Sequence, residues 1–403
     1  MKIGLLQETK RPFDNRVALD PQEASMLKRQ YPSLDICVQS SQHRAFPDAA
    51  YEKEGITVQK DVSDCDLLLG IKEVSLSSLS KGGHYVFFGH FAKQQLYNRP
   101  LLLALMEKKI TFSDYEYMVD EQGRRVCAFG WWAGVVGVYY TLRGYGLRTG
   151  FYFLPEPDPD FTVARIIEIL RAVELPRVKM VLTGRGRVAR GARYLLQEIG
   201  ADILPVDTFL AKDAVERLSC TFAYIDELVR QKSGAGPVDI DEFHLHPERY
   251  ESNFQRFARS SDILVCCHFW DPAAPVYLKP EEYRDPLFRI RMIGDITCDI
   301  AGSICSTLRA STHDAPFYDY NPFTEQEEPA FSSVDNVTVM AVDTCPNALP
   351  RETSHFFGEM LIEHIIRPLA EGRVSAALER STILHAGQFT PNFKYLESFV
   401  REG

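Results

Sequence analysis

Residues 178–207 constrain the fold of this chain more than any other segment. An apolar stretch over 178–183 is followed by a glycine-rich turn, a helical stretch over 188–199 and a second apolar stretch over 202–206, which ends at Asp207. A strand, a turn, a helix and a second strand in this order make up the βαβ unit of a parallel sheet. The segment therefore predicts an α/β fold with a site for a dinucleotide in this unit.

The turn has the pattern G-x-G-x-x-A over residues 184–189. In this pattern Gly184 permits a tight turn, Gly186 lets the backbone approach a pyrophosphate, and Ala189 lets the helix pack closely on the strand. The N–H groups at the start of the helix favour the phosphates. We predict that Gly184, Gly186 and Ala189 bind the cofactor, together with Arg187 from the same turn.

The expected cofactor is NAD or NADP. Asp207, at the end of the second strand, would accept hydrogen bonds from ribose hydroxyls and repel a 2′-phosphate, which favours NAD. Arg185, Arg187 and Arg190 lie in or next to the turn in the sequence and could bind a 2′-phosphate instead. The residues of this segment therefore favour NAD but leave the choice open.

The length and charge of the chain argue against several other classes of protein. With 403 residues it is longer than one hydrophobic core usually grows, so two domains are expected. The net charge is −10 and the chain has no basic tract, which argues against binding to nucleic acid or to an anionic membrane.

The apolar run at the N-terminus is too short for a signal peptide, so a cytoplasmic protein is expected. The nine cysteines lack the spacing of a zinc site, and no metal is expected.

Apolar runs alternate with helical runs along most of the chain, as in a layered α/β protein. The nearly uncharged stretch over 126–142 is shorter than the ~20 residues of a membrane span and predicts a buried helix. The helical run over 352–369 must pack on a partner that periodicity does not identify. Further expected strands cover 3–7, 34–39, 67–71, 85–88, 110–114, 262–267 and 291–296, and expected helices cover 22–30 with Asp20 as a cap, 100–107 and 163–173.

Several ionisable residues follow the expected strands. Lys72 comes directly after the strand over 67–71, and His90 follows the strand over 85–88. Ligands of open α/β sheets bind at the carboxyl ends of strands, so this pair could serve proton transfer in one site. Arg16 and Arg125 could bind substrate carboxylates through bidentate contacts, and Glu116 and Asp299 stand at the ends of further strands.

The segments "LLLGIKEV", "FFGHFAKQQ", "DYEYMVDEQGRRVCAFGWWAGVVG", "VLTGRGRVARGA" and "VDTCPNALPRETSHFFGEML" carry a family resemblance. The chain resembles the alanine dehydrogenase and transhydrogenase superfamily. Within it, the chain is similar to the lysine-forming saccharopine dehydrogenases and to the lysine-ketoglutarate reductase half of aminoadipic semialdehyde synthase. The resemblance implies two Rossmann-like, doubly wound domains with a cleft between them. Residues 1–130 and 345–403 would form the substrate domain, and 131–344 the dinucleotide-binding domain.

The resemblance also implies an activity and roles for residues. The family reaction reduces the imine of L-lysine and 2-oxoglutarate to saccharopine with NAD(P)H, and it runs in reverse as oxidative cleavage. By motif, Lys72 and His90 resemble the proton-transfer pair, and Arg16 and Arg125 resemble carboxylate binders. Matching positions with less defined roles are Lys93, Glu116 and Asp299, which we assign to the substrate, and Asp343, which we assign to the cofactor.

Some choices stay open at this point. The phrases "HPERY" and "CDIAGSI" resemble the NADP-linked branch, whereas Asp207 favours NAD. One alternative activity is an amino-acid dehydrogenase of the alanine dehydrogenase type that uses free ammonia, and another is a catalytically silent nucleotide-binding homologue. The expected partners are small amino-acid and 2-oxoacid substrates. The sequence leaves open the in vivo substrate, the direction of flux and the oligomeric state, including a homo-oligomer.

Overall fold

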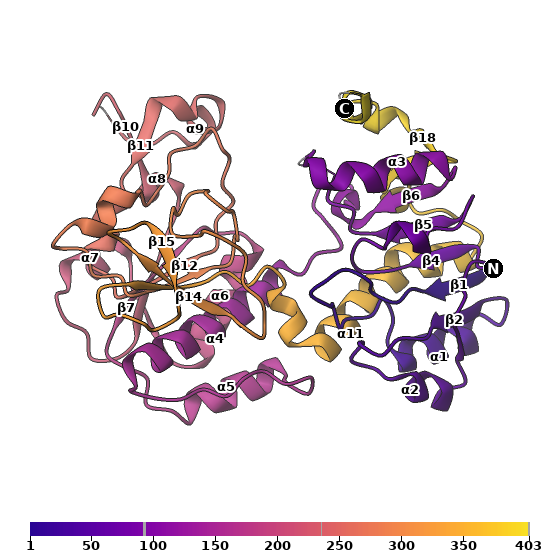
Figure 1. Ribbon diagram of the computed structural model, residues 1–403, viewed down its shortest axis with the longest axis horizontal. Coiled ribbons are helices and arrows are strands. Elements are labelled where there is room, and N and C mark those ends of the chain that lie inside the picture. The colour runs from indigo at the N-terminus through magenta and orange to yellow at the C-terminus, as the bar shows by residue number, and fades with distance from the viewer. Residues whose placement is uncertain (92–93, 235, 402–403) are drawn as a thin grey trace. The chain divides into compact units, whose positions relative to one another are not determined.

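The computed structural model describes residues 1–91, 94–234 and 236–401, and these divide into two compact units. Unit 1 consists of Met1–Phe129 and Leu349–Gly403, and unit 2 of Gly130–Ala348. Within the described residues each unit is built on its own eight-stranded sheet, in which most neighbouring strands are parallel (Figure 1). The predicted α/β class with two Rossmann-like units is confirmed.

The sheet of unit 1 has the strand order β18-β17-β6-β5-β4-β1-β2-β3. Strands β1 to β6 run parallel, whereas β17 and β18 are antiparallel additions at one edge. The carboxyl ends of β1, β4, β5 and β6 therefore share one end of the sheet. The strands are β1 (Lys2–Leu5), β2 (Asp35–Gln39), β3 (Thr57–Gln59), β4 (Leu67–Leu69), β5 (His84–Phe87), β6 (Thr111–Asp114), β17 (Thr382–His385) and β18 (Gln388–Phe389).

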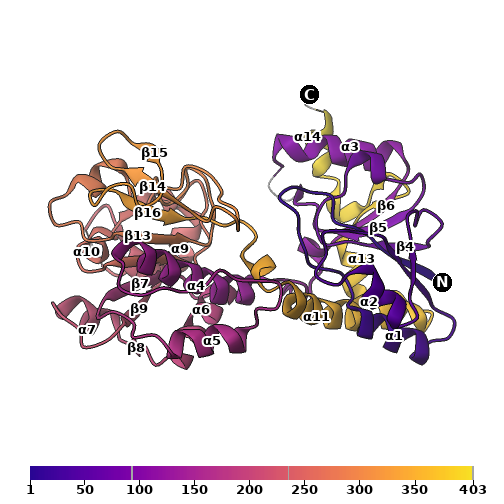
Figure 2. The same ribbon diagram turned by 60° about the horizontal axis from the view of Figure 1, so that its bottom comes forward.

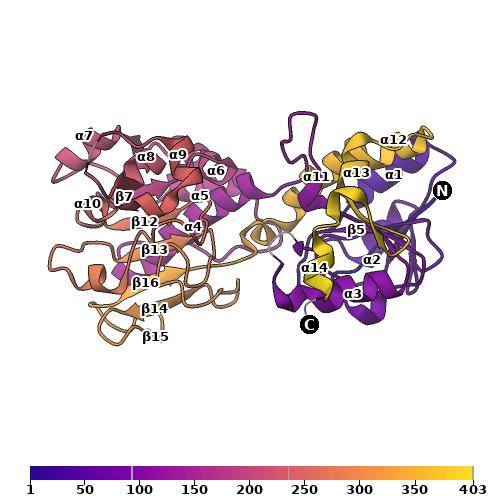
Figure 3. The same ribbon diagram turned by 90° about the horizontal axis from the view of Figure 1, so that it is seen from above.

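Helices cover both faces of this sheet, with α1 (Pro21–Gln30) and α11 (Pro350–Leu361) on one face and α3 (Arg99–Glu107) and α14 (Leu396–Arg401) on the other (Figure 3). The helical run expected over 352–369 is α11, which continues through a π-helical turn at Ile362–Ile366 into α12 (Arg367–Ala370). Phe357 and Leu361 of α11 are fully buried in the core of unit 1. The partner that periodicity could not identify is thus the sheet of unit 1. Unit 1 also contains α2 (Asp48–Lys53) and α13 (Ala376–Ser381).

The N-terminus of α1 packs against α11 through a capping box. Asp20 accepts a hydrogen bond from the backbone N–H of Glu23 at 2.8 Å, and Glu23 accepts one from the N–H of Asp20 at 2.8 Å, which confirms the predicted cap. Glu23 is only 5% exposed, and His355 Nδ1 lies 3.3 Å from its Oε1. A Cβ at Gly358 would stand 2.1 Å from Glu23, so only glycine leaves room for this carboxyl on α11.

Burial, followed by the charges of Asp20 and Glu359, raises the pKa of Glu23 to about 8. Between the ordinary pKa of 4.5 and this value the folded protein holds a proton that the unfolded chain has lost. Stability therefore falls as pH rises through that window. Glu23→Gln keeps an acceptor for the cap but cannot ionise. We therefore expect its unfolding free energy to fall less between pH 5 and pH 8 than that of the wild-type protein, by on the order of 2 kcal/mol.

Urea unfolding followed by circular dichroism at pH 5, 6.5 and 8 measures this difference. Glu52→Gln is the matched control, because Glu52 is an exposed carboxyl of the same unit and is not among the charges that raise the pKa of Glu23. Parallel pH dependence of the wild-type protein and Glu23→Gln would contradict the prediction.

The sheet of unit 2 has the order β15-β14-β16-β13-β12-β7-β9-β8. Strands β14 and β15 are antiparallel, and the strands from β16 to β8 in this order are parallel. The strands are β7 (Lys179–Thr183), β8 (Asp202–Ile203), β9 (Ser219–Ala223), β12 (Ile263–Cys266), β13 (Met292–Asp295), β14 (Phe317–Asn321), β15 (Gln326–Glu328) and β16 (Val337–Met340), with β10 (Val229–Gln231) and β11 (Tyr250–Ser252) as a separate pair.

The sequence prediction for the strand after the glycine-rich turn is wrong. The expected strand over 202–206 is only β8, and Asp207 lies in the first turn of α7 (Val206–Ala211) rather than at a strand end. Pro205 precedes that helix and cannot donate to a strand ladder, which ends the strand early. The strand beside β7 is β9, which the sequence did not reveal, and β8 is the outer neighbour of β9. All five side chains of β9 are buried, so it shows no alternation of polar and apolar residues.

Two helices pack backbone to backbone on one face of this sheet. The predicted buried helix is α4 (Gly130–Thr149), which lies against α6 (Arg187–Glu198) (Figure 2). A Cβ at Gly134 would stand 1.9 Å from the carbonyl oxygen of Val188, and one at Gly191 would stand 1.9 Å from that of Trp131. Among the described helices, none is long and apolar enough to cross a membrane. The remaining helices of unit 2 are α5 (Val163–Arg171), α8 (Ile225–Leu228), α9 (Ile240–Leu245) and α10 (Gln255–Ala258).

Candidate functional site

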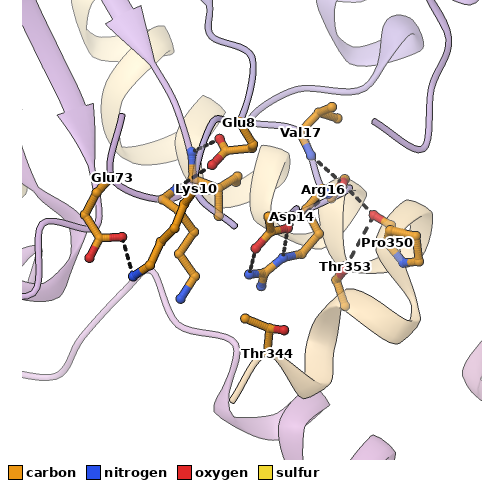
Figure 4. Close-up of polar contacts among 12 residues, drawn as sticks. Glu8, Lys10, Asp14, Arg16, Val17, Glu73, Thr344, Pro350 and Thr353 are labelled. Atoms are coloured by element: carbon orange, nitrogen blue, oxygen red, sulfur yellow. Dashed lines mark hydrogen bonds and ion pairs between the residues drawn. The ribbon is translucent and has the colours of Figure 1, made fainter. Parts of the chain in front are cut away.

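In unit 1, charged side chains gather where parallel strands end (Figure 4). Glu8 follows β1 and accepts hydrogen bonds from the backbone N–H groups of Ile71 and Lys72, at 2.7 and 2.8 Å. These bonds fix the start of the loop after β4, from which the half-buried side chain of Lys72 extends. Burial, and then the charge of Asp14, raises the pKa of Glu8. No local pattern in the sequence indicates Glu8, because its partners lie more than 60 residues away in the chain.

Arg16 and Asp14 form a buried ion pair in the same region (Figure 4). Arg16 Nε donates to Asp14 at 2.8 Å, a second guanidinium nitrogen donates to the other carboxylate oxygen, and the guanidinium lies 4.1 Å from the ring centre of Phe129. Burial opposes ionisation of Asp14, but the charges of Arg16 and Lys72 outweigh it and lower its pKa. Arg16 is thus bound to Asp14 in the structure, which the sequence analysis did not foresee.

His90 is held by a buried carboxylate. Its Nδ1 lies 2.8 Å from Glu73 Oε1, and Lys10 Nζ donates to the other oxygen of Glu73 at 2.8 Å. Burial acts to raise the pKa of Glu73, but His90 and Lys10 outweigh it and lower this pKa to about 2. His90 has a left-handed φ of 54°, and Asn98 donates to its carbonyl oxygen at 3.0 Å. Such backbone strain is common at functional sites.

The loop after β4, which contains Lys72, contacts His90 after β5. Glu73 is the link, because it follows Lys72 in the chain and contacts the ring of His90. With Nδ1 against Glu73, Nε2 is the ring nitrogen that can face a ligand, and 32% of the His90 side chain is exposed.

Asp114, at the end of β6, joins two loops of this edge. It accepts hydrogen bonds from the backbone N–H of Gly89 at 3.1 Å and from that of Glu116 at 2.8 Å. Burial raises the pKa of Asp114 to about 8. The guanidinium of Arg125 lies 3.8 Å from the carboxylate of Glu116. Lys93, the other predicted substrate residue of unit 1, lies outside the described residues.

In unit 2 the glycine-rich turn has the predicted conformation. Gly184 has a φ of 87°, and a Cβ there would stand 2.8 Å from the carbonyl oxygen of Cys267, so both φ and space require glycine. Gly186 is the N-cap of α6, and a Cβ there would meet no described atom within 4 Å. Arg187 begins α6, and Ala189 is buried beneath it. No described atom thus covers the position that a Cβ would take at Gly186.

His268 lies beside this turn, and the sequence prediction did not include it. It follows β12, with Nδ1 2.6 Å from Thr183 Oγ1 and Nε2 2.8 Å from Ser303 Oγ. Burial lowers the pKa of His268 to about 4, so the ring is neutral at physiological pH. A histidine after an apolar strand is the same signal that identified His90, and it could have identified His268.

The predicted acidic residues of unit 2 lie after different strands. Asp299 follows β13 and is half-buried, Asp343 follows β16 and is exposed, and Asp207 is exposed on α7. Asp295, the last residue of β13, is buried and accepts hydrogen bonds from Thr297 and Thr307. Burial raises the pKa of Asp295, and the sequence analysis gave it no role.

Comparison with known proteins identifies relatives along nearly the whole chain. Residues 4–136 match the family model "Alanine dehydrogenase/PNT, N-terminal domain". Alpha-aminoadipic semialdehyde synthase from Arabidopsis thaliana is 28% identical over 437 residues, which cover 98% of this chain and 41% of that protein. The mitochondrial synthase from Mus musculus is 25% identical, and the match covers 98% of this chain and 47% of that protein. The chain thus spans less than half the length of these relatives.

A relative of similar length is saccharopine dehydrogenase [NAD(+), L-lysine-forming] from Neurospora crassa. It is 27% identical over 386 residues, which cover 90% of each chain.

Two solved structures share the fold. An L-alanine dehydrogenase has a TM-score of 0.67 at 17% identity, with 99% of this chain and 100% of that chain covered. A transhydrogenase from Sinorhizobium meliloti has a TM-score of 0.60 at 15% identity, and the match covers 97% of this chain and 100% of that chain. The chain is thus similar to the saccharopine dehydrogenase and alpha-aminoadipic semialdehyde synthase branch of the alanine dehydrogenase and transhydrogenase superfamily, and it shares the fold of the two solved structures.

Proposed function

We propose that the protein is an oxidoreductase of the amino-acid dehydrogenase type that reduces the imine of L-lysine and 2-oxoglutarate to saccharopine with NAD(P)H, and catalyses the reverse reaction. Its relatives on this branch are named as saccharopine dehydrogenases and aminoadipic semialdehyde synthases. The observation that carries the proposal is the contact of Glu73, the residue after Lys72, with the ring of His90. A lysine and a histidine at one strand edge supply the two proton-transfer groups that imine chemistry needs.

Imine formation joins the amine nitrogen to the keto carbon and then expels the former keto oxygen as water. We assign to protonated His90 the proton that this oxygen needs to leave, and Glu73 orients the ring for it. We assign to Lys72 the exchange of the proton on the substrate nitrogen, with Glu8 fixing the backbone from which Lys72 extends. A bound nicotinamide would supply the hydride to the imine carbon.

The substrates carry carboxylates, for which we propose Arg125 and Lys93 as ligands. Glu116 would orient Arg125, whose side chain is 39% exposed. Arg16 would contribute positive charge while Asp14 holds its guanidinium in place. For unit 2 we propose that the backbone at Gly186 and the N–H groups of α6 receive the pyrophosphate, with Arg187 at the start of that helix. We propose Asp343 as a further cofactor residue and Asp299 as a substrate residue.

The test is oxidation of NADH and of NADPH by the purified protein with lysine plus 2-oxoglutarate, compared with pyruvate plus ammonia. Turnover with the first pair and formation of saccharopine by mass spectrometry are the expected results. Turnover only with pyruvate and ammonia would favour an enzyme of the alanine dehydrogenase type. Binding of a dinucleotide without turnover of any amino acid would leave a silent homologue as the better description.

Gly186→Ala tests the cofactor turn. The backbone of Gly186 is extended with a φ of −73°, which alanine adopts readily, and a Cβ meets no described atom within 4 Å. We therefore expect the melting temperature to stay unchanged while the Kd for NADH rises about tenfold or more, because the methyl group would lie where the pyrophosphate approaches. Fluorescence titration with NADH measures this effect, and an unchanged Kd would place the pyrophosphate elsewhere.

A further inference from the structure

The strand beside β7 determines which residues can reach the adenosine ribose of a dinucleotide held at the glycine-rich turn. In the βαβ unit the pyrophosphate lies at the start of the helix, and the ribose lies over the end of the strand adjacent to the first. In this chain β7 lies between β12 and β9, and β9 is the neighbour on the side of β8, the strand that follows α6. Strand β9 pairs with β7 from Lys179 with Ser219 to Thr183 with Ala223. The backbone N–H of Gly184, the first glycine of the turn, donates to the carbonyl oxygen of Ala223 at 2.9 Å. The end of β9 is thus bonded directly to the turn.

A hollow of about 500 Å³ opens at the ends of β8 and β9. The ring of Phe222 supports the guanidinium of Arg193 from α6, which lies 4.0 Å from the ring centre. Thr221 Oγ1 donates to the carbonyl oxygen of Leu204 at 2.9 Å and so ties the two strands together at the floor. The volume is of the size that small ligands fill. The lining includes Arg193, Asp207, Thr221, Phe222, Tyr224 and Glu227.

Two carboxylates stand in this lining, Asp207 on α7 and Glu227 on α8. Arg256 forms an ion pair with Glu227 and also donates to its carbonyl oxygen at 3.0 Å, which fixes the position of the Glu227 side chain. Asp207 is exposed at the start of α7, which packs on β9, whereas Glu227 is half-buried and held by Arg256. Glu227 is therefore the better ordered acceptor for ribose hydroxyls.

We propose that the loop after β9, with Glu227 held by Arg256, receives the adenosine ribose and selects a dinucleotide without a 2′-phosphate. The inference rests on the cofactor part of the proposed function and names the residue that decides between NAD and NADP. A ribose hydroxyl donates to the carboxylate, whereas a 2′-phosphate would place a second negative group against Glu227 and Asp207. Among the residues that line the hollow, Arg193 is the one positive side chain that could attract a 2′-phosphate, and its guanidinium is already stacked on Phe222.

The experiment measures the Kd of the intact protein for NADH and for NADPH by fluorescence titration. Wild-type protein is expected to bind NADH about tenfold more tightly or better at low salt. Glu227→Gln is expected to lower this preference at least about fivefold, because it removes the acceptor charge and leaves Arg256 able to attract a phosphate. Asp226→Asn is the matched control: it removes the same charge from the adjacent, exposed residue, which does not line the hollow, and should leave the ratio unchanged.

Four other outcomes would contradict the proposal, each for a different reason. Tighter binding of NADPH by the wild-type protein contradicts it without any variant. A ratio that changes in Asp207→Asn but not in Glu227→Gln would place the ribose at β8. An equal change in Asp226→Asn and Glu227→Gln would show a general charge effect rather than a subsite. Binding of neither dinucleotide would overturn the proposed function itself.

Discussion

Replacement of Lys72 by methionine is expected to lower the rate of NAD(P)H oxidation with lysine and 2-oxoglutarate by about 10²- to 10⁴-fold, and replacement of His90 by asparagine to do the same. Each variant removes one of the two proton-transfer groups, whereas the residues proposed for the cofactor belong to unit 2. Asparagine suits position 90 because it tolerates the left-handed φ of 54°. Steady-state kinetics give the rates, and fluorescence titration should show an unchanged Kd for the dinucleotide.

Control variants distinguish a loss of catalysis from a loss of folding. Lys81→Met is the matched control for Lys72→Met, since Lys81 is an exposed lysine of the same unit and should leave the rate unchanged. Glu73→Gln removes the charge that holds His90 and should lower the rate, because the ring would lose the carboxylate that orients it. Wild-type rates in both Lys72→Met and His90→Asn would refute the assignment of these residues.

Gly134→Ala should strongly destabilise unit 2. Alanine would gain up to about 1 kcal/mol of helix propensity over glycine. Its Cβ would stand 1.9 Å from the carbonyl oxygen of Val188 and 2.7 Å from the backbone nitrogen of Ala192, so no side chain can move aside. The two helix backbones would have to separate, at a cost that we place at about 3 kcal/mol or more, which outweighs the gain.

Urea unfolding followed by tryptophan fluorescence measures this loss in unit 2, which contains all three tryptophans of the chain at positions 131, 132 and 270. Gly186→Ala is the control, because its Cβ would meet no described atom within 4 Å. An unfolding free energy of Gly134→Ala within about 0.5 kcal/mol of wild type would show that α4 and α6 can separate without loss.

Local sequence patterns determined much of the fold. Apolar runs with clear bounds predicted β1, β2, β4, β5, β6, β7, β12 and β13 to within a few residues, and the glycine pattern predicted the turn before α6. These features depend on neighbouring residues, such as the φ that Gly184 must adopt or the N–H that Asp20 caps. The strand-end positions of Lys72 and His90 followed from the same local reading, because the carboxyl ends of parallel strands share an edge.

Only the tertiary structure decided which strands are neighbours and which carboxylates hold the site. Strand β9 enters the sheet between β7 and β8, so the strand that follows α6 in the chain is not the neighbour of β7. Glu8 and Glu73 are bound to groups 63 and 17 residues away, on strands and loops whose pairing no local period encodes. The sequence by itself thus determined the elements and the glycine-rich turn. Long-range hydrogen bonds and burial, which exist only once the sheets have formed, decided the partners of Lys72, His90 and Arg16 and the strand beside the turn.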